Sequence, residues 1–165
     1  MYTNLANFLN EWKYESEGTL KLFGMLTDEM LNTKLHERVR TAGFLAWHIT
    51  HTVKEMMEKA GLSIEGKNQQ DFNNETVKEI CDAYQQSSAS LVKELAQWSD
   101  EDLLIETEMY GEKWKRGVTL GILIKHQAHH RGQLEIIMRM CNLKVSCVYG
   151  PAYEEWIQYG MEPMK

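Results

Sequence analysis

The first 150 residues of this 165-residue chain contain no proline: Pro151 and Pro163 are the only two. Proline inside a helix removes a backbone hydrogen bond and clashes with the preceding turn, so a chain without it can form long helices. A chain of this length is typical of one domain and can bury a substantial core. We therefore expect a single domain over residues 1–165 that is built from long helices.

Apolar residues recur three or four positions apart in four long segments, as on the buried face of an amphipathic helix. The pattern predicts helices over residues 3–26, 41–60, 74–98 and 118–142. Thr3, Thr41 and either Asn73 or Asn74 are the expected N-caps of the first three helices. Their side-chain oxygens can accept a hydrogen bond from a free N–H group of the first turn.

The segments outside these helices complete the predicted fold. Partial alternation of apolar and polar residues around Tyr110 and Gly111 predicts a small β-hairpin between the third and fourth helices. The tail over residues 143–165, rich in aromatic residues and glycine, is expected to fold back over the bundle. Four long helices with one crossover that contains the hairpin predict an all-α fold, a four-helix bundle with a minor β-hairpin.

Charge and composition argue against several classes of partner. The chain carries 24 acidic and 18 basic residues, a net charge of −6, and no stripe of Lys or Arg that would attract nucleic acid. No apolar run approaches the roughly 18 residues of a membrane span, and the first residues are too polar and acidic for a signal peptide. Three cysteines without a CxxC motif fit a reducing compartment, so we expect a cytoplasmic protein.

The fourth predicted helix contains the segment HQAHH, which holds three of the six histidines. At about 100° per residue, His130 lies about 40° from the centre of the apolar face, His126 at its edge and His129 well outside it. In the second helix, His48 lies about 90° from the apolar centre and His51 about 150°. We therefore expect His48, His126 and His130 to face a cleft between the two helices.

These three histidines could form a metal site. Imidazoles one helical turn apart can bind one ion, and a third from a neighbouring antiparallel helix completes a three-ligand site. Three protein ligands leave one position open, which is typical of catalytic rather than structural zinc. A bound ion also lowers the pKa of a coordinated water or thiol. The alternative is that the histidines form hydrogen bonds in the core and bind no metal.

Five neighbouring residues have less specific interpretations. Gln133 and Arg131 could orient ligands or substrate, although a surface charge is the preferred interpretation for Arg131. Gly132 is expected to allow close helix packing. Trp47 is expected either at a dimer contact or in the cleft. Gln127 occupies the position that holds glutamate in the H-E-x-x-H motif, so a peptidase is disfavoured, and nothing in the sequence selects another general base.

Two segments resemble the DinB/YfiT-like family of metal-binding four-helix bundles: RTAGFLAWHITH and, about 75 residues later, TLGILIKHQAHHRGQL. That family carries a histidine in an x-x-G-x-L-x-x-H-I segment of its second helix, which matches His48. It carries an H-x-x-x-H-R-G-Q segment in its fourth helix, which matches His126 and His130. The resemblance covers nearly the whole chain, and it implies that these three residues are metal ligands.

The resemblance also implies a range of functions. Some relatives are thiol transferases that use bacillithiol, mycothiol or glutathione, others are described as metal-dependent hydrolases, and many are linked loosely to stress. It implies a divalent transition metal, zinc or nickel before iron or manganese, and a low-molecular-weight thiol. We expect a metal-dependent thiol S-transferase that acts on a small molecule and forms a homodimer. The alternatives are a metal-dependent hydrolase and a non-catalytic metal-binding stress-response protein.

Overall fold

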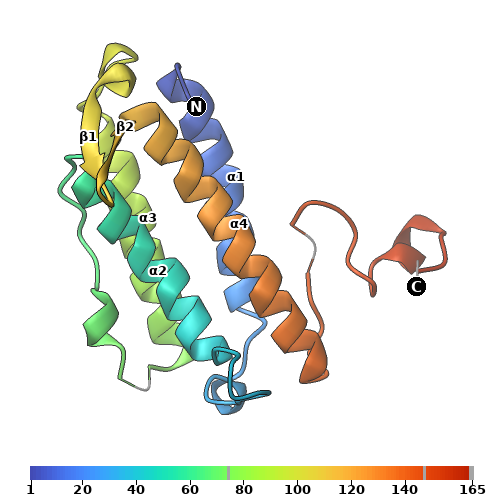
Figure 1. The fold of residues 1–165 in the computed structure, drawn as a ribbon. Helices are drawn as coiled ribbons and strands as arrows, with labels where there is room; N and C mark the ends of the chain where they lie inside the picture. Colours follow the sequence, from blue (N-terminus) through green and yellow to red (C-terminus); the bar gives the residue numbers. More distant parts are fainter. Residues whose placement is uncertain (74, 147, 164–165) are drawn as a thin grey trace.

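In the computed structural model, which describes residues 1–73, 75–146 and 148–163, four long helices form the predicted bundle (Figure 1). They are α1 (Leu5–Phe23), α2 (Ala42–Lys59), α3 (Val77–Leu95) and α4 (Arg116–Met140). α2 and α3 run in one direction along the bundle, and α1 and α4 run in the other. Each of α1 and α2 packs against both α3 and α4. α2 and α4 are therefore antiparallel neighbours.

The segment over residues 60–76 is the crossover of this bundle, because it joins two parallel helices and must return along their length (Figure 1). It runs beside α2: Trp47 Nε1 donates to the Asn68 carbonyl at 3.1 Å, and Lys54 Nζ donates to the Gly66 carbonyl at 3.2 Å. The predicted crossover between the third and fourth helices is wrong, since the hairpin joins two helix ends at one end of the bundle. The observed crossover contains the 3₁₀-helix η2 (Gln69–Asp71), which packs against α2.

Every helix end lies within three residues of its predicted position. Thr41 caps α2 as predicted, and its hydroxyl accepts from the Phe44 N–H at 3.2 Å. The cap of α1 is Asn4 rather than Thr3, because its side chain reaches an N–H of the first turn.

The predicted cap of α3 is wrong. Thr76 occupies that position instead of Asn73, and the other candidate, Asn74, lies outside the described residues. The Thr76 hydroxyl accepts from the Glu79 N–H, and the Glu79 carboxylate accepts from the Thr76 N–H at 2.8 Å. This capping box satisfies two N–H groups at once, which a single asparagine would not.

The β-hairpin is confirmed. β1 (Glu106–Met109) pairs antiparallel with β2 (Glu112–Lys115) across a two-residue turn. The turn residues Tyr110 and Gly111 have φ values of 55° and 87°, the left-handed pair that a type I′ turn requires. The hairpin leads directly into the first residue of α4.

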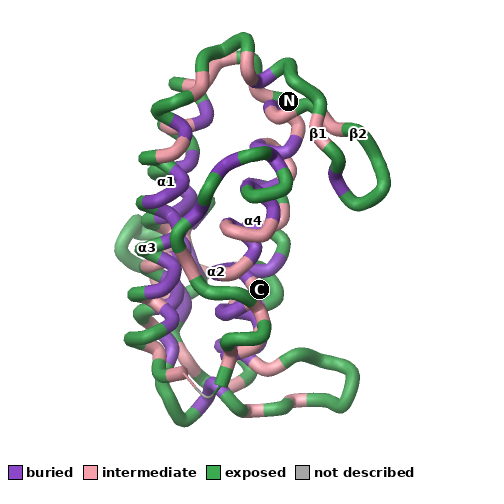
Figure 2. The backbone as a smooth tube through the Cα atoms, turned by 90° about the vertical axis from the view of Figure 1, so that its left-hand side faces the viewer, coloured by how far each residue is buried: buried purple, intermediate pink, exposed green. Residues whose placement is uncertain are grey.

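The inner faces of the four helices are buried along their length (Figure 2). This core explains why the apolar spacing predicted the helices, since burial of apolar area is the main favourable term in folding. Its largest fully buried apolar members include Phe8, Trp12, Leu22, Phe23, Trp47, Ile49, Met56, Met57, Ile80, Tyr84 and Leu91. Within the described residues, no helix combines the length and apolar character that crossing a bilayer requires.

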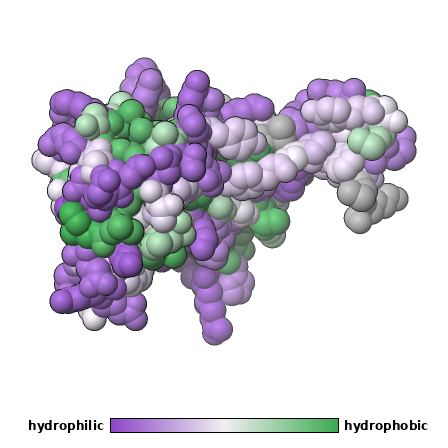
Figure 3. Space-filling model, turned by 90° about the horizontal axis from the view of Figure 1, so that it is seen from above, coloured by the Kyte–Doolittle hydropathy of each residue, from purple (hydrophilic) through white to green (hydrophobic). Residues whose placement is uncertain are grey.

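The tail after α4 has two parts. Its first part packs on α1: the Tyr14 hydroxyl donates to the Val148 carbonyl, and a Cβ at Gly18 would lie 2.9 Å from Cγ1 of Val148. Residues 150–163 then form an arm that projects from the bundle (Figures 1 and 3) and is attached to α4 through the ion pair of Glu154 with Arg139 at 3.0 Å. The predicted fold-back therefore holds for the first part only. The arm exposes large apolar side chains, namely Tyr153, Ile157, Tyr159 and Met161.

Candidate metal centre

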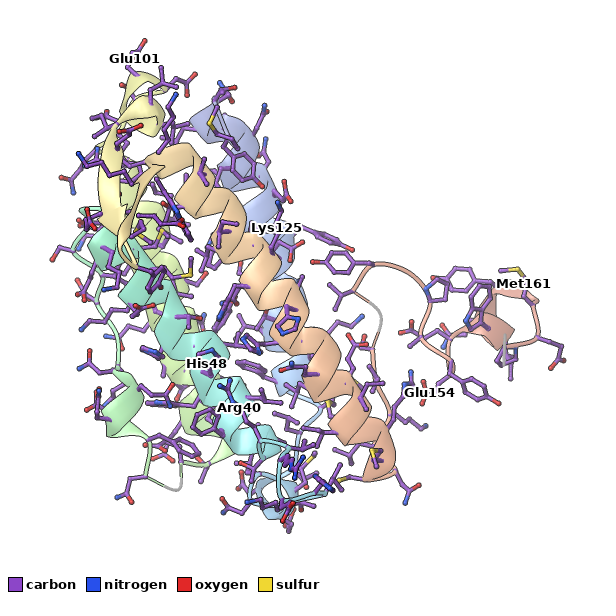
Figure 4. The ribbon with its side chains drawn as sticks, in the orientation of Figure 1. Arg40, His48, Glu101, Lys125, Glu154 and Met161 are labelled. Atoms are coloured by element: carbon purple, nitrogen blue, oxygen red, sulfur yellow. The ribbon has the colours of Figure 1, made fainter. Side chains whose placement is uncertain are left out.

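His48, His126 and His130 converge between α2 and α4. His48 faces α4 from the middle of α2 (Figure 4), and the other two project from successive turns of α4. One nitrogen from each ring lies within 4.8 Å of the other two. The centroid of the His48 ring is 5.1 Å from that of His126 and 4.6 Å from that of His130. The three predicted ligands therefore meet at one point.

Two glutamines set the orientation of two of these rings. His130 Nδ1 lies 2.9 Å from Gln133 Oε1, and His48 Nδ1 lies 3.4 Å from Gln69 Oε1. The Gln133 amide nitrogen lies 3.1 Å from Nε2 of His129, which keeps its oxygen turned towards His130. An amide oxygen can only accept a hydrogen bond, so Nδ1 of each of these two rings carries the hydrogen and Nε2 keeps its lone pair. The predicted orienting role of Gln133 thus has a physical basis.

The geometry fits a divalent transition-metal ion. Nε2 of His126 and Nε2 of His130 are 3.2 Å apart, and two nitrogens bound tetrahedrally to one zinc ion are separated by about 3.3 Å. Among the described residues, no cysteine, aspartate or glutamate joins the three histidines as a further ligand. The group could therefore hold a metal ion through three nitrogens and leave one coordination position free.

All three rings are held neutral. Burial, together with the positive charges that His130 and His48 would carry, lowers the pKa of His126 to about 4. Burial also lowers the pKa of His48 and of His130, against the opposing effect of their glutamine partners. No carboxylate among the described residues accepts a hydrogen bond from these rings. Neutral imidazole is the form that binds a metal, so the site is ready for one at pH 7.

The two flanking histidines stay outside the site, as the helix geometry predicted. His129 is exposed, and His51 lies one turn beyond His48 with a ring-centroid separation of 6.0 Å. Neither belongs to the group whose nitrogens lie within 4.8 Å of one another. Direction around the helix, rather than closeness in sequence, selects the ligands.

A cavity of about 580 Å³ lies beside His130, one of the three converging histidines. His130 and Gln133 form part of its wall, and the segment over residues 35–40 forms much of the opposite wall. A small molecule in this cavity would therefore lie in contact with a candidate metal ligand.

Arg131 is not a surface charge, which corrects the preferred interpretation of the sequence. Its side chain is 2% exposed and forms an ion pair with the Glu15 carboxylate of α1, which is 4% exposed. The same guanidinium donates to the Thr19 hydroxyl at 2.8 Å and to the Tyr149 hydroxyl of the tail. A signal was present: at about 100° per residue Arg131 lies only about 60° from the centre of the apolar face.

The structure also shows the surroundings of Trp47, Gly132 and Gln127. Trp47 is 1% exposed and packs against Phe72 beneath the crossover, so it lies neither at a surface contact nor in the cavity beside the histidines. Gly132 has nothing within 4 Å of where a Cβ would be, so close helix packing does not explain it. Gln127 is buried: its Oε1 accepts a hydrogen bond from the Tyr84 hydroxyl at 3.1 Å, and its Nε2 donates to the Ile49 carbonyl at 2.9 Å.

The DinB family model matches residues 1–162. The chain belongs to the DinB family. YrdA of Bacillus subtilis strain 168, a similar protein, is 34% identical over 166 residues, which span 100% of this chain and 99% of YrdA. The sequence resemblance to DinB proteins is thereby confirmed.

Solved DinB-like structures agree with the fold. The crystal structure of a DinB-like protein from Bacillus cereus ATCC 10987 matches with a TM-score of 0.85 and 34% identity, over 90% of this chain and 100% of that one. The DinB-like protein YjoA of Bacillus subtilis matches with a TM-score of 0.65 and 19% identity, over 82% and 92% of the two chains. The second match supports the fold alone. This DinB protein therefore combines a family bundle with a three-histidine group that could hold a metal.

Proposed function

We propose that this DinB protein binds one divalent transition-metal ion through His48, His126 and His130, and that it transfers a low-molecular-weight thiol to an electrophile. The observation that supports the proposal is the convergence of three neutral imidazoles, one of which, His130, borders a cavity of about 580 Å³. Structural zinc sites are closed by four protein ligands, whereas catalytic sites keep a position for water or substrate. Zinc and nickel are the preferred ions, because nitrogen ligands suit both.

When bound, the ion would lower the pKa of a thiol, so that the thiolate nucleophile is available near neutral pH. The chain supplies three neutral rings, of which two have their tautomer set by Gln69 and Gln133. In this proposal the cavity beside His130 would hold the electrophile. In the transfer a sulfur–carbon bond forms, the leaving group departs with its electron pair, and the thiol proton passes to solvent.

Thiol transfer fits the site better than hydrolysis. A hydrolase commonly uses a general base to take a proton from water. Two acidic residues of the same helices are otherwise placed: Glu55 of α2 accepts from the Tyr110 hydroxyl at 2.7 Å, and Glu135 of α4 borders a different cavity. Neither accepts a hydrogen bond from the three rings, and a metal-activated thiol needs no such base. A purely structural metal would leave the adjoining cavity without a role.

The first test is metal content. Protein purified without a histidine tag is expected to contain, or to bind on titration, about one equivalent of zinc or nickel. His48→Ala, His126→Ala and His130→Ala should each abolish tight binding, whereas His51→Ala should not. Less than about a tenth of an equivalent, with no binding on titration, would instead support histidines that serve only the core.

The second test is turnover. Metal-loaded protein is assayed with bacillithiol, mycothiol or glutathione and the electrophile 1-chloro-2,4-dinitrobenzene, and separately with p-nitrophenyl acetate in the absence of thiol. Thiol-dependent chloride release that disappears in His126→Ala supports the transferase. Ester hydrolysis alone would assign a hydrolase. No turnover, with metal changing only the melting temperature, would assign a non-catalytic protein.

A further inference from the structure

The cavity beside His130 is lined mainly by apolar side chains, which the proposed thiol chemistry does not require. Its volume of about 580 Å³ lies within the usual range of small-molecule sites, about 300–1,000 Å³. The apolar part of its wall consists of Leu35, Val39, Leu45, Ile136, Ile137 and Met140. Of these, Ile136 is 60% exposed and Met140 is 63% exposed. Large apolar side chains left in contact with solvent in a concave surface indicate a ligand with an apolar body.

The rim of the same cavity is positively charged. Arg38 and Arg40 both line it, and His36 and His129 lie on its wall. Arg38 has an exposed ion pair with Glu37, an arrangement that contributes little to stability. The whole chain has a net charge of −6, so a local excess of positive charge at this mouth runs against the overall balance. It favours an anionic group on the ligand.

Arg40 is the cation best placed to bind that group. Its guanidinium stacks over the Phe44 ring at 5.0 Å, and it has no acidic partner among the described residues. Figure 4 shows it on the same side of the bundle as His48. Its positive charge also contributes to lowering the pKa of His48, His126 and His130, so it lies close enough to act electrostatically on the three-histidine group. An arginine fixed by stacking and without a carboxylate presents its donors to an incoming anion.

We infer that the electrophilic substrate of this site is an apolar organic acid, whose hydrocarbon body fills the cavity while Arg40 binds its carboxylate. This inference rests on the proposed function where it calls the ligand a substrate. The binding of the ligand to the cavity does not depend on the proposed function. The apolar wall holds the hydrocarbon, and the carboxylate at the rim fixes which end of it faces His130. A polar thiol gains little from six apolar side chains, which is why the cavity is assigned to the electrophile.

The test measures binding of an unreactive probe, so that it does not depend on turnover. Octanoate and its neutral counterpart 1-octanol are titrated by calorimetry into the full chain, with chelator present and again after zinc loading. Octanoate is expected to bind at least about tenfold more tightly than octanol in both states, because a charge-assisted hydrogen bond to arginine adds to the shared apolar contact.

Matched variants locate the two halves of the site. Arg40→Gln should reduce octanoate affinity about tenfold or more and leave octanol unchanged. Ile136→Gln should weaken both probes. Arg139→Gln is the control. This arginine lies on α4 like Ile136, but it is paired with Glu154 and does not line the cavity, so the affinity for either probe should not change.

Three results would overturn the inference. Equal binding of octanoate and octanol, unaffected by Arg40→Gln, would remove the role of the charge. Failure of both probes to bind would show that the cavity is not a ligand site. Displacement of octanoate by glutathione at equal concentration would assign the cavity to the thiol instead. Loss of metal binding or of turnover with octanoate binding intact would contradict only the proposed function.

Discussion

His130 and Arg131 are neighbours in sequence on α4, yet they face different helices. Both side chains are polar and buried, but their surroundings differ. His130 turns towards α2, where it meets two other neutral rings and a cavity. Arg131 turns towards α1, where Glu15, Thr19 and Tyr149 surround its guanidinium. One side of the helix is open and its three rings are neutral, and the other is closed and contains a paired charge.

The difference separates the residues that hold the fold from those available for function. On the α1 side the charges are paired, because an unpaired buried charge costs several kcal/mol. Each side leaves one buried nitrogen without a hydrogen-bond partner among the described residues, Nδ1 of His126 and Nε of Arg131. Both terminal nitrogens of Arg131 are nevertheless bonded, whereas the three rings of the α2 side have no charged partner. The Nε2 atoms of His126 and His130, 3.2 Å apart, are the ones that face the position of a bound metal ion. Replacing the paired residues on the α1 side should therefore lower the free energy of unfolding, and replacing the histidines on the α2 side should weaken metal binding.

The largest effect is expected on the closed side. Arg131→Met should lower the free energy of unfolding by about 3–5 kcal/mol, because it leaves the Glu15 carboxylate buried without its partner. Urea denaturation followed by circular dichroism measures the change. The double variant Glu15→Leu/Arg131→Met should regain much of the loss, since the unpaired charge is then gone.

Arg139→Met provides a matched control for this prediction. Arg139 is also on α4 and also paired, with Glu154 at 3.0 Å, but its side chain is 35% exposed. Its loss should change stability by no more than about 1 kcal/mol. Equal effects of the two arginine variants would contradict the distinction between the two sides of α4.

The next effect concerns metal on the open side. Zinc at about 100 times its dissociation constant should raise the free energy of unfolding by about 2.7 kcal/mol, because it binds the folded state and not the unfolded chain. His126→Ala should abolish this gain and leave the unfolding of the metal-free protein close to wild type. A large loss of metal-free stability in this variant would show that the ring belongs to the fold rather than to a binding site.

The two sides of α4 also differ in how well the sequence predicted them. The helices were predicted to within three residues at each end, because apolar spacing and the absence of proline act locally along the chain. The three histidines were predicted because their direction on a helix follows from position alone. Arg131 was misjudged although the same helical geometry placed it on the buried side. Its partner Glu15 lies 116 residues away, and only the packing of α1 against α4 brings them together.

Gln69 could not be predicted, because its position depends on the path of the crossover. The segment before α3 has no helical or strand pattern, and the direction of α3 relative to α2 decides whether it passes His48. The same uncertainty explains the misplaced crossover. Chain path between elements depends on tertiary packing, which local spacing does not encode.

The glutamines provide a third prediction, on metal affinity. Gln133→Leu should weaken zinc binding about 10- to 100-fold, a change of about 1.4–2.7 kcal/mol, because the tautomer of His130 is no longer fixed. Gln69→Leu should have a smaller effect, since its contact to His48 is 3.4 Å long rather than 2.9 Å. The exposed Gln97→Leu serves as the control in the same competition titration with a chromophoric chelator. No change in Gln133→Leu would mean that the ring is fixed by packing alone.

The fourth prediction is a pH dependence of the metal-free protein. Burial lowers the pKa of His126 to about 4 in the folded state, below its ordinary value of about 6.5. Between these values the unfolded chain binds a proton that the folded protein does not, so stability is full above pH 6.5 and falls as the pH approaches 4. The loss from this ring should be about 1–2 kcal/mol, after a discount for its partial exposure. Urea midpoints measured in chelator across this range should fall less in His126→Gln; an identical fall would assign the pH dependence elsewhere.

The smallest effect is expected at the edge of the closed side, where Tyr149 joins the ion pair to the tail. Its hydroxyl donates to the Glu15 carboxylate at 2.6 Å, and burial together with this bond raises its pKa to about 12. Tyr149→Phe removes one donor but leaves Arg131 paired, so the free energy of unfolding should fall by only about 0.5–1 kcal/mol. Zinc affinity should stay unchanged, because the hydroxyl lies on the side of α4 away from the histidines. A change in zinc affinity as large as that of Gln133→Leu would show that the two sides of α4 are coupled, and the separation of fold from function along this helix would not hold.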